Sequence, residues 1–450
     1  MKNLTVVLAL IFSGSLLAQN KIDFVEYDLP NGLHVILHED HSTPICAVTV
    51  LYHVGSKNEE TERTGFAHFF EHLLFEGSEN IGRGEFDSYV NKAGGALNAN
   101  TSHDRTFYFE LLPSNQLELG LWLESERMMH AKIQQIGVDT QREVVKEEKR
   151  QRVDNAPYGS WIQNMFSNLY TEHPYNWVPI GSMEHLNAAK LDEFMAFYKK
   201  FYVPNNATLS IAGDIDIEET KKLIEAYFGE IPRGEEVVQP TVEEPALGGE
   251  KVVTVYDNVQ LPAVMMGYRM PPQTSDDAYA LSMASTVLSS GPSSRMYKRL
   301  VDQDQTALQV FAFPYALEQG GAFITFALAN AGKGTDDLIP ALDEEIARLQ
   351  TELISDREFE KIQNQMESKF IQSNSSMAGI AESLADYHTY YGDANLINTE
   401  LERYKKVTKE DIQRVAQQYL VKDNRVVLLY LPKSMEPAPA ADESTTSNTK

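Results

Sequence analysis

The 450-residue sequence contains a single cysteine, Cys46. One cysteine cannot form an intrachain disulfide, so no disulfide framework holds this chain together. Cys46 lies in an apolar, strand-like run from Ile45 to Leu51 and far from the N-terminus. We therefore expect a buried, small hydrophobic side chain rather than a reactive thiol or a lipoprotein acylation site.

Basic residues are also scarce, with 39 Lys and Arg against 65 Asp and Glu and a formal net charge of −26. Because binding to phosphates needs clustered Lys and Arg, this balance argues against a nucleic-acid partner. The acidity favours solubility and, more weakly, basic substrates. A solvated acidic surface is the simpler explanation.

Long hydrophobic runs are missing except at the N-terminus, where Lys2 precedes the mostly apolar run Leu4–Phe12 and a small residue, Ala18, follows. This pattern is typical of a secretory signal peptide over residues 1–18, and it predicts a periplasmic or secreted protein. The alternative is an uncleaved membrane anchor. The run is too short to cross a bilayer comfortably, so we expect no stable membrane anchor.

The length exceeds that of one ordinary core and suits two domains. Two pairs of segments repeat at nearly one offset, which indicates duplication of a whole unit. Residues 48–56 (VTVLYHVGS) resemble 263–271 (AVMMGYRMP), and Phe197–Ile211 resembles Val415–Leu429 at an offset of 218. Amphipathic patterns predict helices at Thr220–Phe228 and Leu338–Leu353.

The expected fold is α+β, with two homologous domains that each pack helices on one face of a mixed or antiparallel sheet. The domains span residues 21–233 and 250–432. Residues 234–249 are rich in Pro, Gly and Glu and form a linker, which gives a clamshell. Residues 433–450 lack apolar periodicity and are expected to be disordered.

The motif His68-Phe69-Phe70-Glu71-His72 lies in a predicted helix that begins at Thr64-Gly65 and runs to about Phe75. Histidines four apart project from one helix face, so His68 and His72 can bind one metal ion. Glu71 lies beside them, where a carboxylate can accept a proton from a metal-activated water. The alternative is two histidines on a surface helix with no metal.

A catalytic zinc site needs a third protein ligand and an open position. The charged helix predicted over Thr140–Arg152 offers Glu147 and Glu148. Its apolar pair Val144-Val145 marks the expected buried face, and Glu148 follows Val144 by four residues and Gln141 by seven. Position therefore favours Glu148 as the ligand over Glu147, with Gln141 as a residue that orients a ligand.

These segments resemble the pitrilysin or insulinase family of inverted-motif zinc peptidases. The resemblance rests on GFAHFFEHLLFEGS (65–78), GGALNANTSHDRTFYF (94–109), REVVKEEKRQRVDNAPYG (142–159) and SSRMYKRL (293–300). The chain length is similar to that of mitochondrial processing peptidase and its bacterial relatives. The resemblance implies one zinc per chain on His68, His72 and Glu148, with Glu71 as general base.

By the same resemblance, the run Leu97-Asn98-Ala99-Asn100 lies on an edge strand beside the zinc. An extended peptide substrate can add to such an edge through main-chain hydrogen bonds, so Asn98 and Ala99 are candidate substrate-binding residues. A polar strand end without a binding role is the alternative.

The second half departs from the family pattern. Active members present an Arg and a Tyr seven residues apart, and here the matching positions are Val301 and Leu308. A homologous partner subunit that lacks the zinc motif would supply both groups in a heterodimer, and a homodimer is also possible. Alternatively, Arg295, Tyr297 or Arg299 substitutes for them.

Two functions follow from these observations. The first is an exported zinc endopeptidase that hydrolyses short or unfolded peptides. The second is a non-catalytic scaffold or peptide-binding subunit of a related complex. Because the zinc-motif residues are all present, the sequence favours the enzyme.

Overall fold

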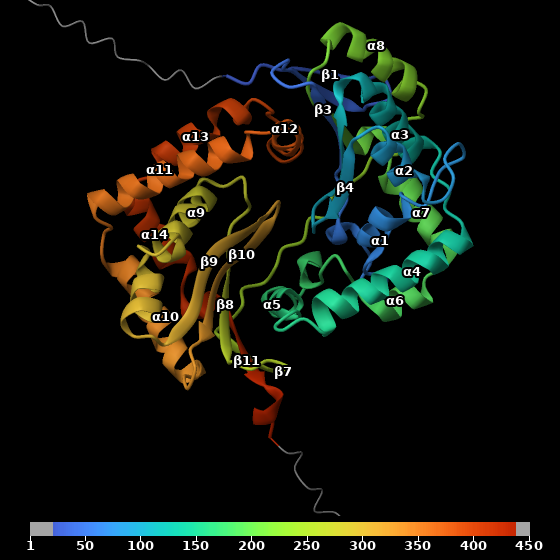
Figure 1. Ribbon diagram of the computed structural model, residues 1–450. Coiled ribbons are helices and arrows are strands. Elements are labelled where there is room, and N and C mark those ends of the chain that lie inside the picture. Colours follow the sequence, from blue (N-terminus) through green and yellow to red (C-terminus); the bar gives the residue numbers. More distant parts are fainter. Residues whose placement is uncertain (1–20, 438–450) are drawn as a thin grey trace, which may run out of the picture.

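The computed structural model describes residues 21–437, which form two lobes, each built on one sheet (Figure 1). The predicted signal peptide and residues 438–450 of the predicted tail lie outside the described residues. Residues 433–435 of that tail form a 3-10 turn. Within residues 21–437, no helix has the length and apolar character needed to cross a membrane.

The two sheets have matching strand orders. The first is β1-β2-β6-β3-β5-β4 and the second is β7-β11-β8-β10-β9. Neighbouring strands are antiparallel except for one parallel pair in each sheet, β2 with β6 and β7 with β11. The first sheet comprises β1 (Val25–Asp28), β2 (His34–Glu39), β3 (Ile45–Tyr52), β4 (Ala96–Thr101), β5 (Thr106–Pro113) and β6 (Ala207–Gly213). The second comprises β7 (Lys251–Asp257), β8 (Ala263–Arg269), β9 (Ala307–Leu317), β10 (Gly320–Ala329) and β11 (Arg425–Pro432).

The repeats found in the sequence fall on equivalent elements of the two sheets. The first repeat pair corresponds to β3 and β8. Strand β3 lies between β6 and β5, and β8 lies between the equivalent strands β11 and β10. The second pair ends on β6 and β11, which begin at Ala207 and Arg425 and so keep the offset of 218. The structure confirms the α+β class with a duplicated sheet.

Each lobe packs its own helices against one face of its sheet. In the first lobe these are α1 (Phe66–Leu73), α2 (Glu85–Lys92), α3 (Leu117–Met129), α4 (Gln135–Lys149), α6 (Met183–Ala188), α7 (Leu191–Phe201) and α8 (Ile217–Phe228). In the second they are α9 (Asp276–Ser289), α10 (Thr335–Thr351), α11 (Asp356–Ser373), α13 (Leu396–Lys406) and α14 (Lys409–Tyr419). Cys46 is a free, buried residue of the first core, as expected.

The opposite face of each sheet is covered by one helix from the other half of the chain. Helix α12 (Met377–Tyr391) packs on β2, β3 and β6, where Ile380 and Leu384 meet Ile36, Ala47 and Ala212. Helix α5 (Trp161–Leu169) packs on β8 and β11 in the same way. Because strand side chains alternate between faces, these contacts use the residues between those of the main cores. The exchange ties the two halves together.

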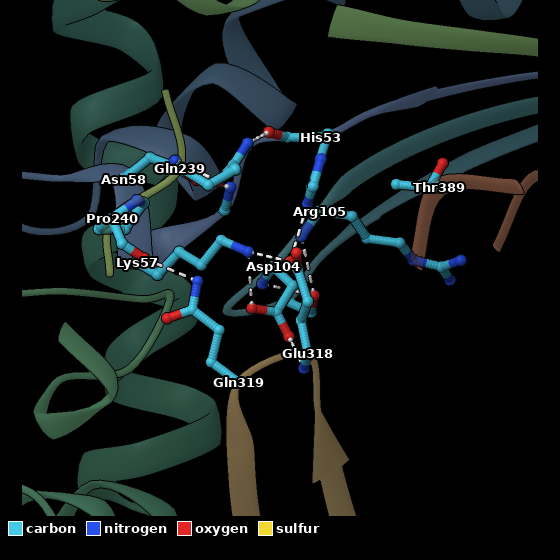
Figure 2. Close-up of polar contacts among 12 residues, drawn as sticks. His53, Lys57, Asn58, Asp104, Arg105, Gln239, Pro240, Glu318, Gln319 and Thr389 are labelled. Carbon is cyan, nitrogen blue, oxygen red and sulfur yellow. Dashed lines mark hydrogen bonds and ion pairs between the residues drawn. The ribbon is translucent and has the colours of Figure 1, made fainter. Parts of the chain in front are cut away.

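A buried polar cluster also joins the halves, at the turn between β9 and β10 (Figure 2). Glu318 in this turn pairs with His53 at 2.8 Å and with the ammonium of Lys57, which also lies 3.1 Å from Asp104 Oδ1. The backbone N–H of Glu318 donates to Asp104 Oδ2 at 2.9 Å. The Lys57 side chain is fully buried, and its pairing with these two carboxylates offsets the cost of burying the ammonium group.

Candidate metal centre

Helix α1 presents its polar residues on one face because its aromatic residues are fixed in the core. Phe66, Phe69 and Phe70 are buried, and their rings stack on Phe194 and Phe197 of α7 at centroid distances of 4.6–5.5 Å. The remaining face carries His68, Glu71 and His72.

The N-terminus of α1 is fixed by a side chain and by a close backbone contact. The carboxylate of Glu59 accepts hydrogen bonds from the backbone N–H groups of Gly65 and Ala67 at 2.9 and 2.8 Å. Gly65 has a φ of 96°, a conformation that residues with side chains rarely adopt. A Cβ added to the neighbouring Gly181 would overlap the backbone of Gly65. Both positions therefore favour glycine, and the helix starts at one defined place.

The three predicted ligands lie together. His68 and His72 of α1 face Glu148 near the end of α4, with their Nε2 atoms 3.4 and 3.2 Å from Glu148 Oε2. Ligand atoms on a tetrahedral zinc ion, at bond lengths of about 2.0–2.1 Å, lie about 3.3 Å apart. The observed separations fit a zinc ion bound by these three residues.

The protonation of these groups also suits a metal. Burial, together with the charge of His72, lowers the pKa of His68 to about 4, so its imidazole is neutral near pH 7. The imidazole of His72, with Nε2 3.2 Å from Oε2, lowers the pKa of Glu148, although burial opposes this. Glu148 Oε2 is buried and has no hydrogen-bond partner among the described residues. A bound cation would provide the missing partner of this oxygen. The carboxylate and the neutral imidazole are also the deprotonated forms that metal binding requires.

Glu71 lies beside the two histidines, and its carboxylate is fixed by a neighbouring strand. Thr101, at the end of β4, donates a hydrogen bond to Glu71 Oε2 at 2.7 Å. Burial raises the pKa of Glu71, and the Thr101 hydrogen bond opposes that rise. A carboxylate with a raised pKa is suited to accepting and returning a proton.

The structure corrects one step of the sequence argument for α4. Val144 was expected on the buried face, but it is 43% exposed, and Val138 and Val145 are the buried residues. Glu148 follows Val145 by three residues, so it still points inward, with its side chain 16% exposed. Glu147 is half exposed and pairs with Arg150. The buried face of α4 therefore contains Val145 and not Val144.

Gln141 lies on α4, but within the described residues it makes no hydrogen bond to a predicted zinc ligand. Its Nε2 donates to Glu76 Oε1 at 2.6 Å, and Glu76 also pairs with Arg83. Glu148 is instead held by Arg152, whose guanidinium lies 2.6 Å from Oε1. Arg152 was within the predicted helix, but nothing in its sequence position distinguished it from Arg150.

Asn98 and Ala99 lie on β4, which forms the edge of the first sheet because β5 is its one pairing partner among the described residues. Ala99 and Thr101 point toward the core side, and Asn98 is exposed on the other face. The Asn98 side-chain oxygen accepts the N–H of Ala99 at 2.9 Å. The alternation of β4, which the sequence contains, places Thr101 on the Ala99 face.

The candidate substitutes in the second half have other partners. Arg295 pairs with Glu358 at 3.1 Å and is 8% exposed, and Arg299 pairs with Asp304, Glu344 and Glu345. Tyr297 and Val301 pack on the second core. Leu308 on β9 is 51% exposed.

Comparison with known proteins gives matches over most of the chain. A family model described as "Insulinase (Peptidase family M16)" matches residues 34–177, and one described as "Peptidase M16 inactive domain" matches residues 188–366. The zinc protease PqqE of Helicobacter pylori is 31% identical over 433 residues, which cover 95% of this chain and 97% of the relative. Mitochondrial-processing peptidase subunit beta of Blastocladiella emersonii is 24% identical, over 87% of this chain and 85% of the relative.

Solved structures with the same fold include a protease from Helicobacter pylori, with a TM-score of 0.87 and 30% identity, over 92% of this chain and all of that chain. The periplasmic protease PqqL from Escherichia coli has a TM-score of 0.74 and 19% identity. That match covers 93% of this chain and 49% of PqqL, so this chain corresponds to about half of that protein.

Proposed function

Because the chain belongs to the insulinase (M16) family of peptidases, as its motifs indicated, we propose that it is an exported zinc endopeptidase that cleaves short or unfolded peptides. One observation carries this proposal. His68, His72 and Glu148 converge with the spacing of a zinc site, and Glu71 lies beside them in a fixed orientation. Export rests on the predicted signal peptide, residues 1–18.

Each residue has a distinct role in the proposed reaction. Zinc on His68, His72 and Glu148 would act as a Lewis acid toward a water molecule and a peptide carbonyl. Glu71 takes the proton of the attacking water and delivers it to the departing amine nitrogen. Thr101 holds the Glu71 carboxylate in the orientation that this transfer needs.

We place the substrate along β4. Within residues 21–437 one edge of this strand has no partner strand, and the strand packs against α1. An extended peptide can therefore add to the sheet through main-chain hydrogen bonds. In this arrangement Asn98 and Ala99 contact the peptide backbone. An extended strand is accessible only in short or unfolded chains, which accounts for the proposed substrate class.

We propose that a homologous partner supplies the Arg and Tyr missing at Val301 and Leu308. The internal ion pairs of Arg295 and Arg299 support this choice over substitution within the chain. A heterodimer with a subunit that lacks the zinc motif fits best, and a second copy of this chain is the other arrangement to test.

The test combines metal analysis with peptide cleavage. We expect one zinc at the His68–His72–Glu148 site, lost in His68→Ala and kept in Glu71→Gln. Cleavage of an unstructured peptide should be weak for the chain alone, increase with the partner and be absent with Glu71→Gln. Strong activity of the lone chain would reject the partner requirement. A folded protein that binds no zinc at this site would instead support the scaffold function.

A further inference from the structure

An apolar cavity of about 270 Å³ lies beside α5, on the face of the second sheet that this helix packs against. Its walls come from α5, from the segment before it, and from β8, β9 and β10. We propose that this cavity receives one large apolar side chain, aromatic or aliphatic, of the peptide substrate. The inference rests on the proposed peptidase function and adds a specificity-determining site away from the zinc ligands.

The walls of the cavity are aromatic and aliphatic. Phe313 of β9 meets Trp161 of α5 edge to face, with ring centroids 6.1 Å apart, and Phe311 stacks on Phe326 of β10 at 5.8 Å. No charged side chain lines the cavity among the described residues. A charged group would lose its hydration there without gaining a partner, so the cavity selects apolar groups. Sites for drug-sized ligands occupy about 300–1,000 Å³, so this smaller volume suits a single side chain.

Phe311 forms the rim of the cavity and is in contact with solvent. Its side chain is 49% exposed, which makes it the most exposed Phe, Tyr or Trp within residues 21–437. An exposed aromatic residue beside an apolar cavity is characteristic of a surface that a ligand covers. A bound apolar side chain would remove this ring from water.

Tyr158 forms one wall, and its position is fixed by the second half of the chain. Its φ of 60° lies in the left-handed region, which residues with side chains seldom adopt. Its backbone N–H donates to Asp257 Oδ2 at 3.0 Å, and its hydroxyl donates to the Leu261 carbonyl at 2.7 Å. Because these bonds hold the wall in place without a ligand, binding costs little ordering of the protein.

The cavity faces the lobe that carries the proposed substrate strand. Phe311 and Phe313 alternate along β9 with Val310 and Ala312 of the second core, so they point away from the helices of their own lobe. Figure 1 shows this face of the second sheet turned toward the first lobe, with α5 in between. In the matching strand orders, β9 occupies the edge position that β4 occupies in the first sheet. An extended peptide fits between the lobes, whereas a folded partner would have to separate them.

The cavity is also close to the zinc ligands along the chain. Helix α4 ends at Lys149, a helical turn follows over Arg150–Asp154, and Pro157 lines the cavity. Pro157 follows Glu148 by nine residues, which span about 14 Å at the helical rise of about 1.5 Å per residue. An extended peptide advances about 3.3 Å per residue. We therefore expect the bound side chain about four or five residues from the peptide bond at the zinc.

Peptide binding to the full chain carrying Glu71→Gln tests the inference without cleavage. The probes are two dye-labelled, unstructured peptides of Ser, Gln and Gly that differ in one residue, Phe or Ala, and fluorescence anisotropy gives their affinities. Burial of an aromatic side chain predicts that the Phe peptide binds about tenfold more tightly or better. Phe311→Ala should remove most of this preference and leave the affinity of the Ala peptide unchanged. Val252→Ala is the control, since Val252 is 56% exposed on β7 at the other edge of the sheet. It should change neither affinity.

A photoreactive peptide locates the bound side chain. With p-benzoylphenylalanine in place of the Phe, illumination should join the peptide to residues of the cavity, and Met265 is the expected target because benzophenones react readily with methionine. Mass spectrometry identifies the joined residue.

Three outcomes would overturn the inference. The first is equal affinity for the Phe and Ala peptides, or binding of neither, and the second is a crosslink outside the cavity. The third is a dimer of the chain that Phe311→Ala dissociates, which would make the cavity a subunit contact. The proposed peptidase function fails separately, through the zinc content and the cleavage of peptides that lack Phe, because neither measurement uses the cavity.

Discussion

The hydroxyl of Thr101 lies 2.7 Å from Glu71 Oε2 and donates a hydrogen bond to it. This contact joins the edge strand on which we place the substrate to the proposed general base. A hydrogen bond to a charged group contributes about 1.5–3 kcal/mol. Thr101→Val keeps the shape of the side chain and removes only this bond. We expect kcat/KM for a peptide to fall about tenfold or more, with the zinc content unchanged.

Thr220 on α8 provides the control for this substitution. Its hydroxyl is buried and has no hydrogen-bond partner among the described residues, so Thr220→Val makes the same chemical change away from the site. Activity should match that of the unmodified protein. If Thr101→Val lowers zinc content along with activity, Thr101 supports the metal site as a whole rather than the base.

Glu147 and Glu148 are adjacent, but only Glu148 faces the histidines. Glu148 Oε2 lies 3.2–3.4 Å from both Nε2 atoms, whereas the half-exposed Glu147 pairs with Arg150. Glu148→Gln replaces an anionic ligand with a weak neutral one, so zinc affinity should fall at least tenfold. Glu147→Gln should bind zinc normally. Zinc titration against a competing chelator distinguishes the two, and equal losses would contradict the assignment of Glu148.

The sequence predicted the local features of the site because helix periodicity is a local property. A spacing of four places His68 and His72 on one face whatever the rest of the fold does. The face of α4 was harder to predict. Two adjacent valines, Val144 and Val145, differ by 100° around the helix, and only packing shows that Val145 is the buried one.

Contacts between distant segments could not be predicted from the sequence. The duplication indicated two similar sheets, but nothing in it showed that α5 and α12 each cover the sheet of the other half. Lys57 and Glu318 are 261 positions apart and pair only because the β9–β10 turn reaches the first lobe. The same applies to His34 and His388, whose rings stack because α12 covers the first sheet.

Replacing Arg295 tests whether the second half of the chain supplies a substrate-binding cation of its own. Burial alone would raise the pKa of Glu358, but its hydrogen bonds with Arg295 and Ser355 lower it to about 2. Arg295→Met removes the partner of this carboxylate, so the free energy of unfolding should fall by about 1–2 kcal/mol. Zinc content and the kcat/KM of the partner-containing enzyme should not change.

The exposed Arg357, next to Glu358 on α11, is the matched control for Arg295. Arg357→Met should change neither stability nor activity in denaturant titrations and peptide assays. A loss of activity in Arg295→Met without a loss of stability would show that Arg295 acts on the substrate. The partner would then be unnecessary for that role.

The ion pairs of Glu318 make the packing between the two halves of the chain sensitive to acid. Burial would raise the pKa of Glu318, but the hydrogen bond from His53 and the charges of His53 and Lys57 outweigh it and lower the pKa to about 2, from an ordinary 4.5 (Figure 2). Because the folded-state value is the lower one, the carboxylate stabilises the fold above about pH 4.5. That contribution is lost as the pH falls from about 4.5 toward 2.

Glu318→Gln should therefore destabilise the protein most near neutral pH. The shift corresponds to about 3 kcal/mol at pH 7, and the difference between variant and unmodified protein should shrink steadily between pH 4.5 and pH 3. Urea unfolding at a series of pH values measures this difference. The exposed Glu60, three residues from Lys57, is the control, and Glu60→Gln should show a small difference at every pH. A Glu318→Gln deficit that stays constant down to pH 3 would mean that shape rather than charge joins the turn to the first lobe.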